Sequence, residues 1–243
     1  MQTRCLSCPL RKMSLFAPIS DEEVDFMQSF KSGELKVEAG TTLLMEGSNS
    51  PQLYTVLDGM GLRYKTLPDG GRQVINFIMP GDFIGLQAGV MQEMKHSAES
   101  TTAMTLCVFE RKALWRLFQQ HPERAFDLTW LAAVEESFLG ESLAVLGQMS
   151  GLERVARTFA RLHRRLRAMG AEQAGGVPFP YRQQDLADAL GLSLVHTNKT
   201  LKKLREKQVV TWRDGAFVVP DYARLCEIAQ MAPESAPSVR PLI

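Results

Sequence analysis

The chain has 243 residues, a formal net charge of +1 and 45% hydrophobic residues, which is typical of a globular protein of one or two domains. No segment approaches the ~18 consecutive apolar residues of a membrane-spanning helix, and the first residues lack the apolar stretch of a secretion signal. We therefore expect a cytoplasmic protein, in which the four cysteines are thiols or metal ligands rather than disulfides.

The first 30 residues predict an irregular arm followed by a short helix. Residues 1–20 form the arm, which holds the spaced pair Cys5 and Cys8 and two prolines. A helix is predicted over 21–30, because Ser20 offers an N-cap and Glu23, three residues later, completes a capping box.

Residues 33–110 show the pattern of a small β-barrel or sandwich. Short apolar runs alternate here with glycine, proline and aspartate at nearly regular spacing. The segment 68–71, Pro-Asp-Gly-Gly, predicts a hairpin turn, because proline fixes its own φ and glycine accepts a positive φ. Residues 21–122 are therefore predicted to form one β-rich domain.

A long helix is predicted over residues 123–150. No proline interrupts residues 123–149, and apolar side chains form two stripes along this segment. One stripe contains Leu131, Val134, Phe138, Val145 and Met149, and the other contains Leu128, Leu139, Leu143 and Leu146. The helix is far longer than the average of ~11–12 residues. We expect one face to cover its own domain and the other to pack on a second copy of the chain; a central helix in a larger core is the alternative.

The C-terminal third carries the positive charge of the chain. Residues 151–232 have a net charge of +6 and residues 1–150 have −5, which favours a nucleic-acid partner for the C-terminal part. Residues 151–230 are predicted to contain four helices and a hairpin, at 152–169, 182–190, 193–207, 221–230 and, for the hairpin, 209–219. Residues 231–243 hold three prolines and few apolar residues, which predicts a disordered tail.

Residues 183–204 have the spacing of a helix-turn-helix. Ala187 is small enough for two helices to approach closely, and Gly191 follows where a tight turn needs a positive φ. Ser193 then offers an N-cap for a basic helix, and the hairpin behind that helix predicts a winged version that binds DNA. The predicted DNA-binding residues are Ser193, Val195, His196, Asn198, Lys199, Lys202 and Lys203. For His196, a place beside the helix is an equal alternative.

In the order of these parts, the chain resembles the Crp/Fnr family of bacterial transcription regulators over residues 5–230. Residues 80–85, Pro-Gly-Asp-Phe-Ile-Gly, are similar to the glycine motif of the family's β-roll. The resemblance implies an α+β fold: a cyclic-nucleotide-binding-like β-roll sensor domain at 21–122, a dimerisation helix at 123–150 and a winged helix-turn-helix at 151–230. It also implies a homodimer that binds a palindromic promoter site in double-stranded DNA, without enzymatic activity and without a membrane partner.

The chain departs from the family's pattern in two places. Members that bind cyclic AMP use a glutamate and an arginine to hold the ribose and the phosphate, where this chain has Leu86 and His96. Cyclic AMP is therefore not expected as a ligand, and the chain resembles the Fnr/FixK-like branch more closely. On the recognition helix, Val195, Asn198 and Lys199 stand where the family uses glutamate, serine or glycine, and arginine. Valine cannot accept a hydrogen bond from a cytosine amine, so we expect a site that differs from the family's TTGA-type half-site.

The cysteines allow three hypotheses. Fnr-type sensors hold an oxygen-labile iron–sulfur cluster, and the resemblance implies Cys5, Cys8 and Cys107 as its metal ligands here. The family's third N-terminal cysteine falls at Ser14, although four ligands are usual for such a cluster. Alternatively, Cys5 and Cys8 oxidise to a disulfide. In the third hypothesis Cys107 is a small buried residue and no cofactor is bound, so that abundance or another ligand of the β-roll controls activity.

Three further expectations concern a partner, enzymatic activity and the exposure of one histidine. Residues 69–72 correspond to a loop through which family members contact RNA polymerase, which implies that partner here; an ordinary hairpin tip is the alternative. An enzyme is the rival from another class, but the sequence contains none of the hydrolase, nucleotide-binding or zinc-protease motifs. His163, which lies among arginines, is predicted to face solvent.

Overall fold

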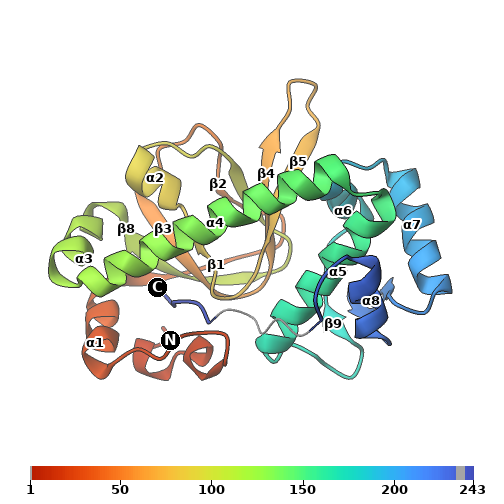
Figure 1. The fold of residues 1–243 in the computed structure, drawn as a ribbon. Coiled ribbons are helices and arrows are strands. Elements are labelled where there is room, and N and C mark those ends of the chain that lie inside the picture. The colour runs from red at the N-terminus through yellow and green to blue at the C-terminus, as the bar shows by residue number, and fades with distance from the viewer. Residues whose placement is uncertain (1, 234–238) are drawn as a thin grey trace. The chain divides into compact units, whose positions relative to one another are not determined.

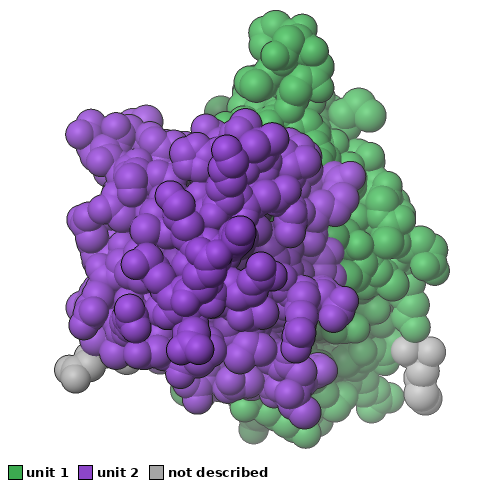
Figure 2. Space-filling model, turned by 90° about the vertical axis from the view of Figure 1, so that its right-hand side faces the viewer, with its two compact units in different colours: residues 1–12, 16–134, 240–243 green, residues 13–15, 135–239 purple. Residues whose placement is uncertain are grey.

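The computed structural model describes residues 2–233 and 239–243, and the chain forms two compact units (Figures 1 and 2). Unit 1 contains residues 1–12, 16–134 and 240–243, and unit 2 contains residues 13–15 and 135–239. One of the places where the chain passes between the units lies within a single long helix, between residues 134 and 135.

Unit 1 begins with two short 3₁₀ helices, η1 (Cys5–Ser7) and η2 (Pro9–Lys12), which are followed by helix α1 (Asp21–Phe30). The predicted capping box is present at the start of α1. The Ser20 hydroxyl accepts the N–H of Glu23 at 3.2 Å, and the Glu23 carboxylate accepts the N–H of Ser20 at 2.7 Å. Both donors would otherwise lack partners at the helix N-terminus, so these two residues fix where α1 begins.

Two antiparallel four-stranded sheets form the body of unit 1 (Figure 1). The first has the order β1, β8, β3 and β6, with bounds Lys31–Val37, Met104–Glu110, Gln52–Asp58 and Phe83–Ile84. The second has the order β2, β7, β4 and β5, with bounds Thr42–Leu44, Ser97–Ser100, Gly61–Thr66 and Arg72–Ile78. In the first sheet, Thr55 of β3 lies opposite Cys107 on one side and Phe83 on the other.

Side chains from both sheets meet in one apolar core. Its members include Val56, Ile78, Ala98 and Leu106, none of which exposes any side-chain surface, and helix α2 (Leu86–Met91) adds Ala88. The predicted hairpin joins β4 to β5: the N–H of Leu67 donates to the carbonyl of Gly71 at 2.8 Å, and Gly70 has a φ of 83°. The predicted β-rich domain is therefore a β-roll.

Helices follow the β-roll, as predicted. A 3₁₀ turn, η3 (Arg111–Ala113), leads into α3 (Leu114–Gln120), and after His121 the helix α4 (Pro122–Gln148) runs for 27 residues. Proline is favourable at the first position of a helix because its missing N–H would have no partner there. Along α4, Leu128 and Leu131 are buried, whereas Leu139 and Leu143 are 50% and 73% exposed in the single chain. The apolar side chains are thus covered in the first part of the helix and largely exposed in its second half.

Unit 2 is a winged helix-turn-helix. Its helices are α5 (Gly151–Ala168), α6 (Gln183–Leu190), α7 (Leu194–Glu206) and α8 (Tyr222–Ile228). A three-stranded sheet with the order β10, β11, β9 completes it, with bounds Thr211–Arg213, Ala216–Val218 and Val177–Pro178. The rings of Phe159, Phe179 and Phe217 pack edge to face with centroids 4.9–5.7 Å apart, which is a favourable aromatic geometry. This aromatic cluster ties α5 to the wing.

Two expectations about exposure are wrong. His163 is only 4% exposed, because its ring packs 5.0 Å from that of Tyr222 in α8. The tail predicted as disordered over 231–243 is ordered at its end: Arg240 pairs with Phe16 in a parallel β-bridge, and Leu242 and Ile243 are buried. Residues 234–238 of that tail lie outside the described residues. Within the described ranges, no helix has the length and apolar character that crossing a membrane requires.

Candidate DNA-binding interface

The turn between α6 and α7 fixes the angle between the two helices. Gly191 ends α6 with a φ of 61°, and its N–H donates to the carbonyl of Ala187. The N–H of Leu192 donates to the same carbonyl at 3.1 Å. Ser193 caps α7 by accepting the N–H of His196 at 3.2 Å. These contacts confirm the predicted helix-turn-helix geometry at Gly191 and Ser193.

Charged contacts hold the first helix in place. The Asp185 carboxylate, only 1% exposed as a residue, accepts the Arg182 N–H at 2.9 Å and pairs with the Arg182 guanidinium at 2.7 Å. At the other end of α6, Arg154 of α5 donates to the carbonyl of Leu190 at 3.0 Å. Both ends of α6 are thus anchored, so α7 is carried on a rigid support.

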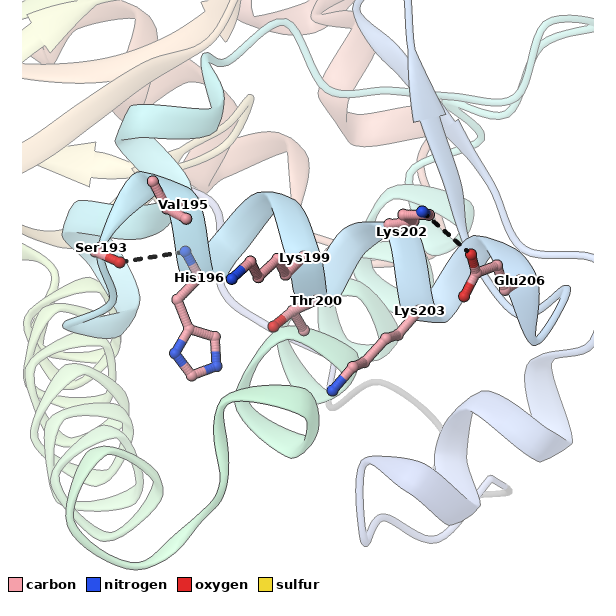
Figure 3. Close-up of a pocket in the computed structure, with 8 residues that line it drawn as sticks. All are labelled: Ser193, Val195, His196, Lys199, Thr200, Lys202, Lys203 and Glu206. Carbon is pink, nitrogen blue, oxygen red and sulfur yellow. Dashed lines mark hydrogen bonds and ion pairs between the residues drawn. The ribbon is translucent and has the colours of Figure 1, made fainter.

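Helix α7 turns one polar face to solvent. Thr197, Thr200 and Leu204 are buried, whereas Val195 is 64% exposed. Figure 3 shows the side chains that line a hollow along the exposed face of this helix. They are Ser193, Val195, His196, Lys199, Thr200, Lys202, Lys203 and Glu206. The hollow brings together six of the seven residues predicted to bind DNA; the seventh, Asn198, is exposed but does not line it.

The exposed face of α7 is positively charged. Lys202 and Glu206 lie 3.8 Å apart at i and i+4, and both side chains are more than half exposed, so their pairing is weak. Among the residues that the structure describes, Lys199 and Lys203 form no ion pair. Three ammonium groups are therefore available for an anionic partner. Thr200 and Glu206 were not predicted; Glu206 falls one turn after Lys202, a spacing that sequence reasoning can detect.

His196 occupies a different position from the lysines. A Cβ atom on Gly151 would lie 2.7 Å from the His196 Nε2, so the imidazole packs against the first residue of α5. In Figure 3 its ring points away from Val195. Of the two roles weighed for His196, this contact supports packing beside the recognition helix.

The wing lies next in the chain. Strands β10 and β11 pair with Trp212 opposite Phe217, and the indole N–H of Trp212 donates to the carbonyl of Phe179 at 3.2 Å. At the tip, Asp214 and Gly215 have φ values of 51° and 73°, as a tight hairpin requires. Arg213, beside the tip, is exposed and adds another positive charge.

In unit 1 the three cysteines singled out by the sequence lie near one another. Burial raises the pKa of Cys107 to about 12, and nearby Cys5 and Cys8 raise it further, whereas the Lys31 ammonium opposes this rise. Burial also raises the pKa of Cys5. These two thiols are therefore protonated at neutral pH, which makes them slow nucleophiles.

A buried ion pair that sequence reasoning missed lies among these thiols. The Lys31 ammonium donates to Glu34 at 2.6 Å and to the carbonyl of Thr3 at 2.7 Å, and both side chains are less than a tenth exposed. Burial alone lowers the pKa of Lys31, but the hydrogen bond to Glu34 and the neighbouring charges hold it above its usual value. A permanent positive charge thus lies beside Cys107.

This arrangement does not fit an iron–sulfur cluster. The chain offers three nearby thiols where four ligands are usual, and the positive charge of Lys31 lies near one of them, Cys107, and opposes the rise of its pKa. Ser14, at the place of the missing cysteine, instead donates to the carbonyl of Ala168 at 3.3 Å. Within residues 2–233 and 239–243, no three histidine, cysteine or acidic side chains are grouped so that they could hold a metal ion.

The glycine motif shapes a turn beside a buried arginine. Gly81 and Gly85 have φ values of 81° and 96°, and the Asp82 carboxylate accepts the N–H of Met79 at 2.9 Å. The guanidinium of Arg63, on β4, donates to the carbonyl of Phe83 at 3.0 Å, and Arg63 is 7% exposed. The positive charge of the Arg63 guanidinium therefore lies near His96.

The environment of His96 predicts a pH-dependent stability. Burial, followed by the charge of Arg63, lowers its pKa to about 4 from 6.5. Between these two values the unfolded chain binds more protons than the folded one, so the free energy of unfolding decreases as the pH falls from 6.5 to 4. In urea denaturation at pH 7, 6 and 5, His96→Gln should flatten this decrease, whereas Lys95→Gln, at an exposed neighbour, should not. Parallel profiles for wild type and His96→Gln would contradict the prediction.

Comparison with known proteins adds to this picture. Residues 34–121 match the family described as "Cyclic nucleotide-binding domain", and residues 153–228 match the "Crp-like helix-turn-helix domain". The chain is 34% identical over 179 residues to the "Transcriptional activatory protein AadR" of Rhodopseudomonas palustris, which covers 73% of each chain. It is 29% identical over 226 residues to the "Nitrogen fixation regulation protein FixK" of Bradyrhizobium diazoefficiens, which covers 93% of each. The solved structure of FixK2 from Bradyrhizobium japonicum superposes with a TM-score of 0.74 and 26% identity, covering 82% of this chain and 98% of that one.

Proposed function

Because the chain belongs to the Crp/Fnr family of transcription regulators, we propose that its helix α7 reads one half of a palindromic promoter site while a second copy of the chain reads the other half. The chain is a DNA-binding regulator, and its family consists of regulators rather than enzymes. Members with this helix-turn-helix act as dimers on promoter DNA. Two recognition helices related by a two-fold axis bind half-sites about one helical turn, roughly 34–36 Å, apart.

One observation carries the proposal: the exposed, basic face of α7 on an anchored helix-turn-helix. A recognition helix needs side chains that reach base edges and phosphates from one face, and Lys199, Lys202 and Lys203 supply donors there. Ser193 lies at the N-terminus of the same helix, where free N–H groups favour a phosphate. We assign these residues to the DNA contact together with Val195 and Asn198. His196, which packs on Gly151, supports the fold around the contact.

A gel-shift titration tests the proposal directly. The full-length protein is titrated against a palindrome selected from random DNA and against a scrambled duplex of equal length, at several salt concentrations. We expect the palindrome to bind at least ~1,000-fold more tightly than the scrambled duplex, which is the lower end for specific DNA-binding proteins. Equal affinity for the two duplexes would overturn the proposal.

The preferred half-site should differ from the family's TTGA-type sequence. Val195 presents an apolar side chain where family members use a glutamate that accepts from a cytosine amine, so that base pair loses its reader. Selection from random palindromes with wild type and with Val195→Glu should recover the family's base at that position only in the variant, with a preference of about 10- to 100-fold, the value of ~1–3 kcal/mol for one base contact. If the wild type selects the unaltered family half-site, the interpretation of Val195 is wrong.

We further propose that the regulator, once bound to its promoter site, contacts RNA polymerase. Because promoters lie in the cytoplasm, we also place the protein there. The tip of the β4–β5 hairpin, residues 69–71, is exposed, and the Arg72 guanidinium lies over the ring of Tyr64 at 5.1 Å. A fixed, charged tip of this kind offers a surface to another protein. The relatives AadR and FnrL are named as transcriptional activators, which supports activation as the outcome.

The signal to which the β-roll responds is a separate part of the proposal. The burial of Arg63 and Leu62 inside the roll, together with Leu86 and His96 at the family's nucleotide-binding positions, supports a roll that works without cyclic AMP. Because the thiols do not fit a cluster, no step is assigned to an iron–sulfur cofactor. The proposal leaves three alternative modes of control: the abundance of the protein, oxidation of Cys5 and Cys8, and another ligand of the roll.

A further inference from the structure

The end of the chain returns to unit 1 after the DNA-binding unit. Residues 240–243 belong to unit 1, although the residues before them in sequence, up to 239, belong to unit 2. In Figure 1 the mark for the C-terminus lies beside the strands of unit 1. We call the segment Arg240–Ile243 the strap. Sequence composition predicted disorder for this segment, so its order must come from specific contacts.

Polar contacts from three residues of unit 1, Ala17, Thr55 and Asp82, help to hold the strap. The N–H of Ala17 donates to the carbonyl of Arg240 at 2.9 Å, and the Arg240 guanidinium pairs with the Asp82 carboxylate at 3.2 Å. The hydroxyl of Thr55, a residue only 2% exposed, donates to a main-chain oxygen of Ile243 at 2.5 Å. The side chains of Arg240 and Asp82 are 13% and 5% exposed, so water screens their attraction little.

Two apolar side chains complete the attachment. Leu242 and Ile243 are 7% and 6% exposed. Pro241 between Arg240 and Leu242 restricts the backbone, which lowers the entropy lost on docking. A segment that buries two aliphatic side chains and satisfies its polar groups has the features of a bound peptide.

We propose that unit 1 contains a binding site for the strap, formed by Ala17, Thr55 and Asp82, and that the docked strap restrains the DNA-binding unit. Eleven residues, 229–239, join the end of α8 to the strap. Because the strap belongs to the same chain as its site, docking is an intramolecular step, so weak intrinsic binding is enough to keep the site filled. Docking closes a further loop between the two units and reduces the conformations open to unit 2. The second half of this proposal rests on the proposed DNA-binding function.

The site also lies next to Cys107. Thr55 and Cys107 are directly opposed on neighbouring antiparallel strands, so their side chains lie on the same face of the sheet. The strap oxygen held by Thr55 therefore lies close to this thiol. Docking of the strap and binding of a reagent at the Cys107 thiol are then linked, because each changes the binding free energy of the other by the same amount.

Hydrogen exchange at the Ala17 amide reports docking. In the full-length protein, a variant that lacks residues 240–243 should exchange this amide at least tenfold faster than wild type. Thr55→Val, which removes the hydroxyl at nearly equal volume, should give an intermediate acceleration. Val239→Ala, at a side chain that is 56% exposed just before the strap, is the matched control and should leave the rate unchanged. Asp82 is not varied, because its carboxylate also holds the Met79 N–H.

Two readouts separate the halves of the proposal. If removal of residues 240–243 leaves Ala17 exchange unchanged, the strap site does not exist and the whole inference is overturned. If exchange accelerates and the affinity for the selected palindrome shifts by more than threefold, both halves hold. If exchange accelerates at unchanged affinity, the site stands and the restraint on unit 2 is refuted. If the wild type itself does not bind the palindrome, the proposed function fails. The exchange rate of the Ala17 amide tests the strap site independently of that outcome.

The reactivity of Cys107 provides a further check on the site. Removing residues 240–243 should increase the rate at which iodoacetamide alkylates Cys107 severalfold. Cys226, in unit 2 and fully buried, serves as the internal control in the same peptide map. Equal Cys107 rates in the two proteins would contradict the placement of the strap beside this thiol.

Discussion

Replacing both Lys199 and Lys202 by glutamine should lower the affinity for the selected palindrome at least ~100-fold. Each dimer loses four positive charges from its two recognition helices, and a single base or phosphate contact contributes ~1–3 kcal/mol. The dependence of the binding constant on salt should also weaken, because fewer counterions are released. Fluorescence-anisotropy titrations between 50 and 300 mM salt, in which wild type and variant are compared, measure both effects.

A matched control separates local contacts from net charge. Lys112→Gln removes one charge from a side chain in unit 1 that is 84% exposed and pairs only with Glu110 among the described residues. This variant should bind DNA as wild type does, apart from a small uniform effect of charge. Thermal melting shows whether each variant remains folded. If the double variant keeps the affinity and the salt dependence of wild type, α7 does not contact DNA in the way proposed.

Charged residues in the exposed second half of α4 should abolish the dimer. Leu139 and Leu143 lie one turn apart and are 50% and 73% exposed, and a Cβ on Gly140 or Gly147 would meet no atom within 4 Å. Small and apolar residues together allow two helices to approach closely. We expect Leu139→Glu combined with Leu143→Glu to place four carboxylates in this contact and to shift the protein to a monomer in sedimentation velocity. Palindrome affinity should then fall by ~100-fold or more, because the two half-sites are no longer bound together.

The control for the dimer variant lies on another face of the same helix. Ser137 is exposed and is about 160° away from Leu139 around an ideal helix. Ser137→Glu should leave the dimer intact and the palindrome affinity unchanged. If the Leu139→Glu, Leu143→Glu variant still sediments as a dimer, the second chain packs elsewhere.

Local signals explain why the helix-turn-helix was predictable. Gly191 needs a left-handed φ and Ser193 caps the following helix, and both requirements act between residues close in sequence. The capping box at Ser20 was found for the same reason. The strands of the β-roll were predicted from turn residues between apolar runs, and the long helix from the absence of proline. In each case the energy that fixes the element arises within a few residues of it.

Long-range contacts explain what the sequence did not reveal. The arginines around His163 suggested solvent exposure, but Tyr222, 59 positions later, covers its ring. The prolines of the tail suggested disorder, yet Leu242 and Ile243 find an apolar site formed far earlier in the chain. In the cysteine region, no sequence motif connects Lys31 with Cys107. The pairing of β1 with β8 brings these two residues together. Composition describes a residue's neighbours in sequence and not those that the fold supplies.

The contact between Phe16 and Gly81 has a consequence for how this protein can be divided. A Cβ on Gly81 would lie 2.0 Å from the Phe16 ring, and Phe16 itself is 5% exposed. The arm before α1 is therefore a structural part of the β-roll, seated on its glycine turn. A fragment that starts at α1 would uncover this turn and the apolar surface under the ring, so an expression boundary drawn at residue 21 would give an aggregation-prone product. The smallest self-sufficient piece of unit 1 has to include the segment that precedes its first regular helix.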